Sequence, residues 1–167
     1  MKYSITFYDF WHLSSGTSAG PTMDSLVVKD NYGLPYLPGK TLKGLIKEAV
    51  EILDSSKVKS IFGDEGSSIA NSYFSNATLD EDTISYLVNN PTLKKHLFDK
   101  FASTQIGENG IAVDKSLREI EVVVPLVLSG IIECEDEDLI TQALGMIKQI
   151  GLNRNRGLGR CKIEVIK

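Results

Sequence analysis

Three arginines and three glycines stand close together near the end of the sequence. Residues 151–160 read Gly-Leu-Asn-Arg-Asn-Arg-Gly-Leu-Gly-Arg and hold three of the chain's four arginines. Arginine binds phosphate through paired hydrogen bonds, and glycine lets backbone N–H groups approach an anion closely. A glycine directly after a helix can also be only its C-terminal cap, which would explain Gly151 alone. The segment predicts a binding site for nucleic-acid backbone with five contributors: Arg154, Arg156, Gly157, Gly159 and Arg160.

A second candidate phosphate site lies in residues 33–44. This segment nearly spells a nucleotide-binding P-loop, which needs a glycine, four residues and then Gly-Lys-Ser/Thr. Here the spacing differs, and Pro35 and Pro38 lack the backbone N–H groups that a phosphate cradle uses. We therefore exclude a nucleotide-hydrolysing site. What remains is a loop that leads into a helix N-terminus, which attracts anions, with Lys40 and Lys43 beside it.

Two further polar residues bracket the segment between the first strand and that loop. His12 stands at its entry and Asp24 near its middle. A carboxylate can hold a divalent metal ion or orient a hydroxyl group, and an imidazole can move a proton. An isolated loop aspartate is more often a turn or cap residue, and an isolated histidine is more often structural. Both residues are therefore candidates whose role depends on the rest of the chain.

The net charge of the chain is −4, whereas nucleic-acid-binding domains usually carry a basic surface. Its acidic residues concentrate away from the arginines, notably at Glu133, Glu135, Asp136, Glu137 and Asp138. Such a run favours a helix N-terminus, where carboxylates interact well with the helix dipole. Because the charge is segregated, a local basic site is compatible with an acidic protein.

Length and composition are those of an ordinary globular protein. The 167 residues fit a single domain, 1–167, with 42% hydrophobic and 24% charged residues. No apolar run approaches the roughly 20 residues of a membrane helix. The first residues alternate like a strand rather than forming a signal peptide. Cys134 and Cys161 suggest neither a disulfide framework nor a metal cluster, so we expect a cytoplasmic protein.

Hydrophobic periodicity predicts the elements that position these residues. We expect strands at residues 2–10, 72–79, 119–134 and 162–166. We expect helices from an N-cap at Thr41 to residue 53, within residues 80–101 with a break at Pro91, and at 136–150. Residues 103–118 lack an apolar period, which indicates an exposed arm.

This order of elements predicts an α+β protein with a ferredoxin-like βαββαβ fold. It reads β-α-β, an insertion, and then β-α-β, with loop insertions at about 13–40 and 80–118. Such folds place their helices on one face of an antiparallel sheet. They do not define a function, but many of them bind RNA.

Several separate motifs of the chain resemble one family. His12, Asp24, Asp30 and the segment Gly-Leu-Pro-Tyr-Leu-Pro-Gly-Lys-Thr-Leu-Lys-Gly at 33–44 match the N-terminal region of the RAMP superfamily. More narrowly, they resemble the backbone subunits of type III CRISPR effector complexes. Residues 61–63, 73–77, 107–125 and 151–160 are similar to further motifs of that family, in the same order. One departure is Asn76-Ala77, where the family usually has Asp-Ala.

The resemblance implies a specific function. Such subunits stack along a guide RNA with further copies of themselves and with other RAMP subunits, and they bind target RNA. It assigns target cleavage to Asp24, with a weakly bound divalent metal ion, Mg²⁺ or Mn²⁺, at the same residue. It assigns guide contacts to His12, Lys40, Lys43 and the 151–160 segment.

Three alternatives remain open at this stage. The chain could be a scaffold subunit that binds RNA without cutting it. It could be a guide-processing endoribonuclease in which His12 acts as a general acid or base without metal. It could also be a ferredoxin-like interaction module that has no affinity for RNA.

Overall fold

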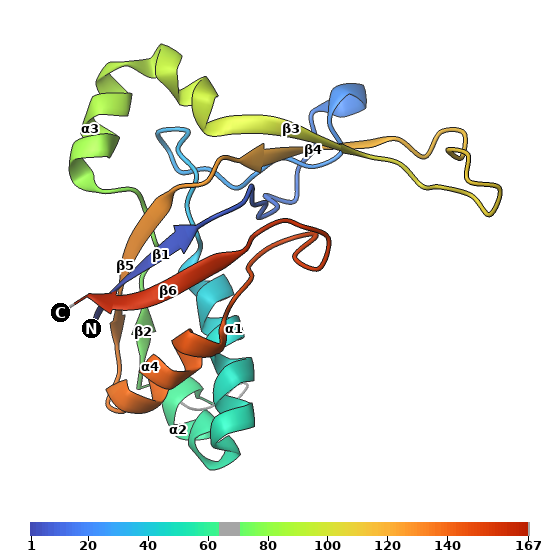
Figure 1. The fold of residues 1–167 in the computed structure, drawn as a ribbon. Coiled ribbons are helices and arrows are strands. Elements are labelled where there is room, and N and C mark those ends of the chain that lie inside the picture. The colour runs from blue at the N-terminus through green and yellow to red at the C-terminus, as the bar shows by residue number, and fades with distance from the viewer. Residues whose placement is uncertain (64–70, 167) are drawn as a thin grey trace.

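The computed structural model describes residues 1–63 and 71–166. Four strands form the main sheet: β1 (Lys2–Phe7), β2 (Tyr73–Phe74), β5 (Val127–Glu133) and β6 (Cys161–Ile166). Their order in the sheet is β2-β5-β1-β6, and β1 pairs antiparallel with both β5 and β6. Helix α1 (Gly39–Leu53) lies in the chain between β1 and β2, and α4 (Glu137–Met146) connects β5 to β6. The predicted ferredoxin-like fold is therefore confirmed (Figure 1).

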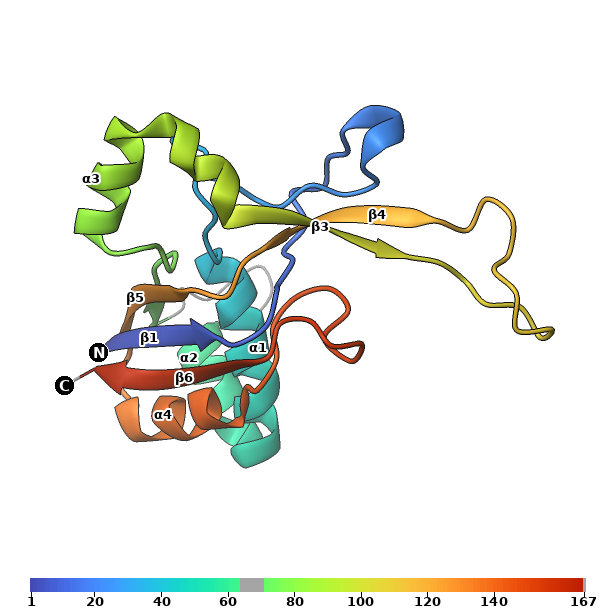
Figure 2. The same cartoon turned by 45° about the horizontal axis from the view of Figure 1, so that its top comes forward.

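Both helices pack on the same face of the sheet (Figure 2). Strand β1 alternates in burial, with Tyr3, Ile5 and Phe7 buried on this face. Its central residue Ile5 lies opposite Leu128 of β5 and Ile163 of β6 in the sheet register, and both are buried. The buried helical residues of this core are Leu42, Ile46, Ala49 and Val50 of α1 and Ile140, Ala143 and Leu144 of α4.

Helix α1 begins three residues earlier than the sequence indicated. Its N-cap is Pro38 rather than Thr41, and the Pro38 side chain makes no capping hydrogen bond to the helix. Instead, the Gly39 N–H donates to the Asn76 side chain at 2.9 Å. A β-carbon at Gly39 would collide with the backbone carbonyl of Phe74. The helix start is thus fixed by contacts with β2 and with the segment that follows it, which no local capping signal reveals.

Helix α4 confirms the prediction for the acidic run. Asp136 is the N-cap and accepts from the Leu139 N–H at 3.3 Å, and Glu137 and Asp138 lie in the first turn. The helix ends at Met146, shorter than the predicted 136–150. The short helices η1 (Gly20–Thr22), η2 (Ser55–Lys57) and α2 (Val58–Phe62) occupy connecting segments.

A second, two-stranded sheet departs from the sequence prediction. Residues 119–134 were expected to form one strand, but they contribute to β4 (Arg118–Val123) and to β5, which lie in different sheets. The division falls at Pro125, which lacks the N–H needed to continue a ladder. The partner of β4 is β3 (Phe98–Ser103), which lies where a helical stretch was expected to end. Before β3 come α3 (Glu81–Asn89) and the 3-10 helix η3 (Pro91–Leu97).

Beyond β3 and β4 the chain extends as an arm, residues 104–117, away from the main sheet (Figures 1 and 2). Four large apolar residues of the arm are exposed: Ile106, Ile111, Val113 and Leu117. The sequence prediction of an exposed arm is confirmed over most of its length. None of the helices in the described residues has the length and apolarity required for a membrane span.

Gly159 allows a test of the connection between α4 and β6. Its φ is +72°, and a β-carbon there would overlap the Ile150 carbonyl, whereas Gly157 has φ +90° with open space around it. We expect Gly159→Ala to destabilise the protein by about 3 kcal/mol and Gly157→Ala by only about 1 kcal/mol. Urea unfolding followed by circular dichroism measures both. Equal losses for the two variants would contradict the packing described here.

Candidate nucleic-acid interface

The 151–160 loop is held by its own backbone to the segment that follows β1. The Gly159 N–H donates to the Phe10 carbonyl at 2.7 Å, and the Leu152 N–H donates to the His12 carbonyl at 2.9 Å. A β-carbon at Gly151 would collide with that same His12 carbonyl. Gly151 and Gly159 are therefore required by packing, whereas Gly157 faces open space. Of the three glycines, Gly157 is the one free to let a ligand approach the backbone.

The three arginines of this loop are exposed but point to different places. Arg154 lines a cavity of about 310 Å³ between α1 and α4, beside Glu48 and Lys148. Arg156 lines a larger cavity at the base of the arm. Arg160 forms an ion pair with Asp9 at 3.1 Å and lies over the Tyr8 ring. The sequence predicted that these arginines form one binding site, but in the structure they point to different places.

The cavity beside Arg156, here called the arm-base cleft, is a basic hollow near the predicted site. Its volume is about 720 Å³, and Lys115 and Arg118 join Arg156 on its walls. The remaining walls are mostly hydroxyl and amide groups, with one acidic residue: Ser103, Thr104, Gln105, Val113, Asp114 and Ser116. Such a lining suits a phosphodiester backbone, which needs cations and hydrogen-bond donors.

Sequence reasoning missed Lys115 and Arg118 as members of this cleft. Arg118 is the one arginine outside the 151–160 segment, and more than thirty residues separate it from that segment. Only the pairing of β3 with β4 brings it to the foot of the arm. The available signal was a lysine and an arginine within the last four residues of the predicted arm.

The lysines at the start of α1 also differ from each other. Lys40 is exposed, whereas the Lys43 ammonium donates to the Phe62 carbonyl at 3.2 Å. The N–H of Gly39 is already bonded to Asn76, and those of Thr41 and Leu42 are bonded to the Pro38 carbonyl. The helix start therefore offers an anion mainly the Lys40 side chain.

Asp24 lies beside the first residues of β4, where the arm joins the body. Its Oδ2 accepts from the Glu119 N–H at 2.8 Å, and its own N–H donates to the Glu119 carbonyl at 2.8 Å. The side chain remains exposed. Its other carboxylate oxygen is thus available to RNA or to a metal ion.

A metal ion at this site would have Asp24 as its single protein ligand among the described residues. Among residues 1–63 and 71–166, no group of three or more His, Cys, Asp or Glu residues could hold one. Since Mg²⁺ and Mn²⁺ take about six oxygen ligands, the others would come from RNA phosphate and water. This arrangement is compatible with the weak binding expected from the sequence.

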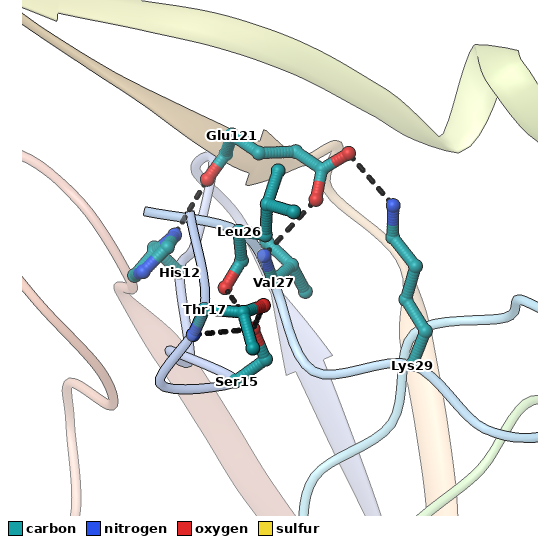
Figure 3. Close-up of polar contacts among 7 residues, drawn as sticks. All are labelled: His12, Ser15, Thr17, Leu26, Val27, Lys29 and Glu121. Atoms are coloured by element: carbon teal, nitrogen blue, oxygen red, sulfur yellow. Dashed lines mark hydrogen bonds and ion pairs between the residues drawn. The ribbon is translucent and has the colours of Figure 1, made fainter. Parts of the chain in front are cut away.

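His12 is fully buried, and both its ring nitrogens have hydrogen-bond partners, of which Figure 3 shows the Glu121 carbonyl. Nδ1 bonds to the Glu121 carbonyl, and Nε2 bonds to the Ser25 hydroxyl at 3.0 Å. Because a carbonyl only accepts, Nδ1 donates to Glu121, while the Ser25 hydroxyl can either donate to Nε2 or accept from it. A direct RNA contact by this ring stays a prediction, and it would require the ring to give up one of these partners.

The chain resembles known proteins in its sequence pattern and in its fold. It matches the family model described as the RAMP superfamily over residues 6–162. None of the curated proteins matches it. Among solved structures, a chain of the Type III-B Cmr-beta complex bound to cognate target RNA has a TM-score of 0.70 and 12% identity, covering 98% of this chain and 95% of that one. A chain of Type III-B Cmr-beta in the apo state has a TM-score of 0.73 and 12% identity, covering 99% and 96%.

At such low identity the structural likeness establishes the fold, and it agrees with the family assignment. The family model spans nearly the whole chain, including the Asp24 segment, the arm and the 151–160 loop. The chain therefore belongs to the RAMP superfamily.

Proposed function

We propose that this chain is an RNA-binding backbone subunit of a type III CRISPR effector complex. The observation that carries the proposal is the fold match along almost the entire chain to a subunit of a Type III-B complex described as bound to cognate target RNA. The arm-base cleft supports it, because three cations line a polar hollow beside the loop where the sequence predicts RNA contacts. In this role the chain binds guide RNA through the cleft, Arg154 and Lys40.

The overall charge favours assembly with further subunits. At a net charge of −4, one copy presents only local basic sites to RNA. Several copies, or other RAMP subunits, aligned along one guide would join these sites into a continuous basic track. The exposed apolar residues of the arm also suit contact with a neighbour or with RNA bases. The proposed partners are thus guide RNA, target RNA and subunits of the same superfamily.

The proposal includes cleavage of target RNA at Asp24. In this reaction the RNA 2′-hydroxyl attacks the adjacent phosphorus, and the bond from phosphorus to the 5′-oxygen breaks. The available Asp24 oxygen orients the attacking hydroxyl or receives its proton, while the Glu119 N–H fixes the other oxygen. A bound divalent cation would supply charge neutralisation at the phosphate. The leaving 5′-oxygen takes a proton from water, so the products are a 2′,3′-cyclic phosphate and a 5′-hydroxyl.

A scaffold without cleavage is the second candidate. The observation that favours it is that one oxygen of Asp24 already accepts a backbone N–H, as in a purely structural turn. Guide processing by His12 has less support, since its ring is buried and both nitrogens are engaged.

Purification without added RNA tests the binding function. We expect the full chain to elute from a sizing column well above its mass of 18.4 kDa, with an absorbance ratio that shows bound nucleic acid. RNase treatment should shift it to smaller species, and sequencing of the RNA should reveal repeat-derived guides when these are co-expressed. An RNA-free monomer that fails to bind synthetic single-stranded RNA at low salt would overturn the proposal.

A further inference from the structure

Glu121 connects the arm to the Asp24 segment by contacts from both its side chain and its backbone. One carboxylate oxygen accepts from the Val27 N–H at 3.0 Å, and the other pairs with the Lys29 ammonium at 2.7 Å (Figure 3). The Glu121 N–H donates to the Ser25 carbonyl at 3.0 Å, and its own carbonyl accepts from His12. The Glu121 side chain is only 12% exposed. This carboxylate is therefore partly desolvated and fully occupied by partners on the segment that follows Asp24.

These contacts make residues 24–29 an additional strip along β4. Ser25 forms a parallel bridge with Ile120, and Asp24 exchanges two hydrogen bonds with Glu119. At the other end, the Lys29 ammonium lies 4.0 Å from the centre of the Phe98 ring in β3. The strip is thus attached to both strands that carry the arm.

His12 completes the attachment from the segment that follows β1. Its ring joins the Glu121 carbonyl to the Ser25 hydroxyl, which bonds in turn to Ser14 at 3.0 Å. Ser25 is the neighbour of Asp24 in the chain. Displacing the Glu121 side chain would therefore loosen the strip on which Asp24 is mounted without touching Asp24 itself.

We propose that Glu121 is a positioning residue that fixes the Asp24 segment against the base of the arm. Arm and segment then meet RNA as one unit, so that the phosphodiester presented to Asp24 is set by where the arm holds the strand. The inference rests on the proposed function for its consequence in catalysis. The attachment itself is a property of the protein without RNA and is measurable separately.

The substitutions Glu121→Gln and Glu121→Ala test the inference, with Lys29→Met as a second probe. Glutamine keeps one acceptor oxygen but loses the charge, so it retains one of the two side-chain contacts. Lys29→Met removes the ion pair and keeps an apolar chain over Phe98. The control is Glu51→Gln, which makes the same charge change at an exposed position of α1.

The first readout is hydrogen exchange of the RNA-free full chain, resolved by NMR. We expect the Val27 amide to exchange about 10-fold faster in Glu121→Gln and about 100-fold faster in Glu121→Ala, since the latter removes its acceptor. Amides in the middle of β1 should be unchanged, which separates loosening of the strip from global unfolding. Unchanged exchange at Val27 in both variants overturns the attachment.

The second readout is single-turnover cleavage of labelled RNA complementary to the copurified guide. We expect roughly 10-fold slower cleavage for Glu121→Gln and up to about 100-fold for Glu121→Ala, with RNA affinity within about 3-fold of wild type. Some cuts should move to neighbouring phosphodiesters. Wild-type rate and cut position in both Glu121 variants, alongside an inactive Asp24→Asn, would overturn the positioning role while leaving the proposed function intact. Wild-type cleavage by Asp24→Asn would instead overturn the catalytic part of the proposed function, and the exchange measurement would still decide the attachment.

Discussion

Replacing Arg154, Arg156 and Arg160 together by glutamine is expected to weaken binding of single-stranded RNA by on the order of 100-fold at moderate salt. Each charged hydrogen bond to phosphate contributes a modest free energy. The three free energies add, so the corresponding factors in affinity multiply. The salt dependence should change too, because each lost phosphate contact on single-stranded RNA reduces the slope of log K against log salt by about 0.7. A reduction of about 1.4 to 2.1 in that slope is therefore expected.

The single variants should rank according to where each arginine points. Arg156 lies in the arm-base cleft with Lys115 and Arg118, so Arg156→Gln should cause the largest loss of affinity. Arg160 is already paired with Asp9 at 3.1 Å, so binding phosphate would compete with that ion pair. Arg160→Gln should therefore cause the smallest loss. Fluorescence anisotropy with a labelled RNA, measured from low to moderate salt, provides both affinity and slope.

A charge-matched control separates site binding from the effect of net charge. Replacing the exposed Lys2, Lys47 and Lys95 by glutamine removes the same number of positive charges at other places on the surface. This control should retain most of the affinity and nearly the full salt slope. If the two triple variants lose affinity equally, the 151–160 loop is not a specific RNA site.

The ferredoxin-like core was predictable because its signals are local and periodic. The alternation in β1, the helical spacing in α1 and the acidic run before α4 each report burial or capping within a short window. The boundary between β4 and β5 was not predictable, because the valines before Pro125 continue an apolar run while the chain passes from one sheet to another. Likewise β3 was hidden in a stretch of helical character, since its pairing with β4 is a long-range contact.

The candidate site was predictable as a set of residue types but not as an arrangement. Composition identified the arginines, but the direction of each depends on how Gly159 bonds to the Phe10 carbonyl and how Gly151 packs on the His12 carbonyl. His12 was expected at an RNA surface, yet the structure buries it as a link between β4 and Ser25. The role of Glu121 was not predictable, because its four contacts come from residues about a hundred positions away in the sequence.

Asp24→Asn is expected to lower the rate of target RNA cleavage by about 10³-fold, within the range observed for loss of a positioned acid or base. Asparagine preserves the geometry, because its side-chain oxygen can still accept the Glu119 N–H that Asp24 binds at 2.8 Å. What it removes is the negative charge on the exposed oxygen, and with it both metal binding and proton acceptance. RNA affinity should stay within about 3-fold of wild type, since a neutral amide in place of a carboxylate changes few contacts with the backbone.

The substrate supplies an independent check of the same chemistry. A target with a single 2′-deoxynucleotide at the cleavage position lacks the attacking hydroxyl, so the wild-type chain should bind it normally and leave it uncut. Cleavage of the all-RNA target should require Mg²⁺ or Mn²⁺ and stop in chelator, and the products should carry 2′,3′-cyclic phosphate ends. Asp82→Asn, an exposed change in the first turn of α3, is the matched control and should cut at the wild-type rate. Normal cleavage by Asp24→Asn would exclude Asp24 as the catalytic residue, and normal cleavage of the deoxy-substituted target would exclude the 2′-hydroxyl as the nucleophile. No cleavage even by the wild-type chain on a bound target would favour the scaffold role.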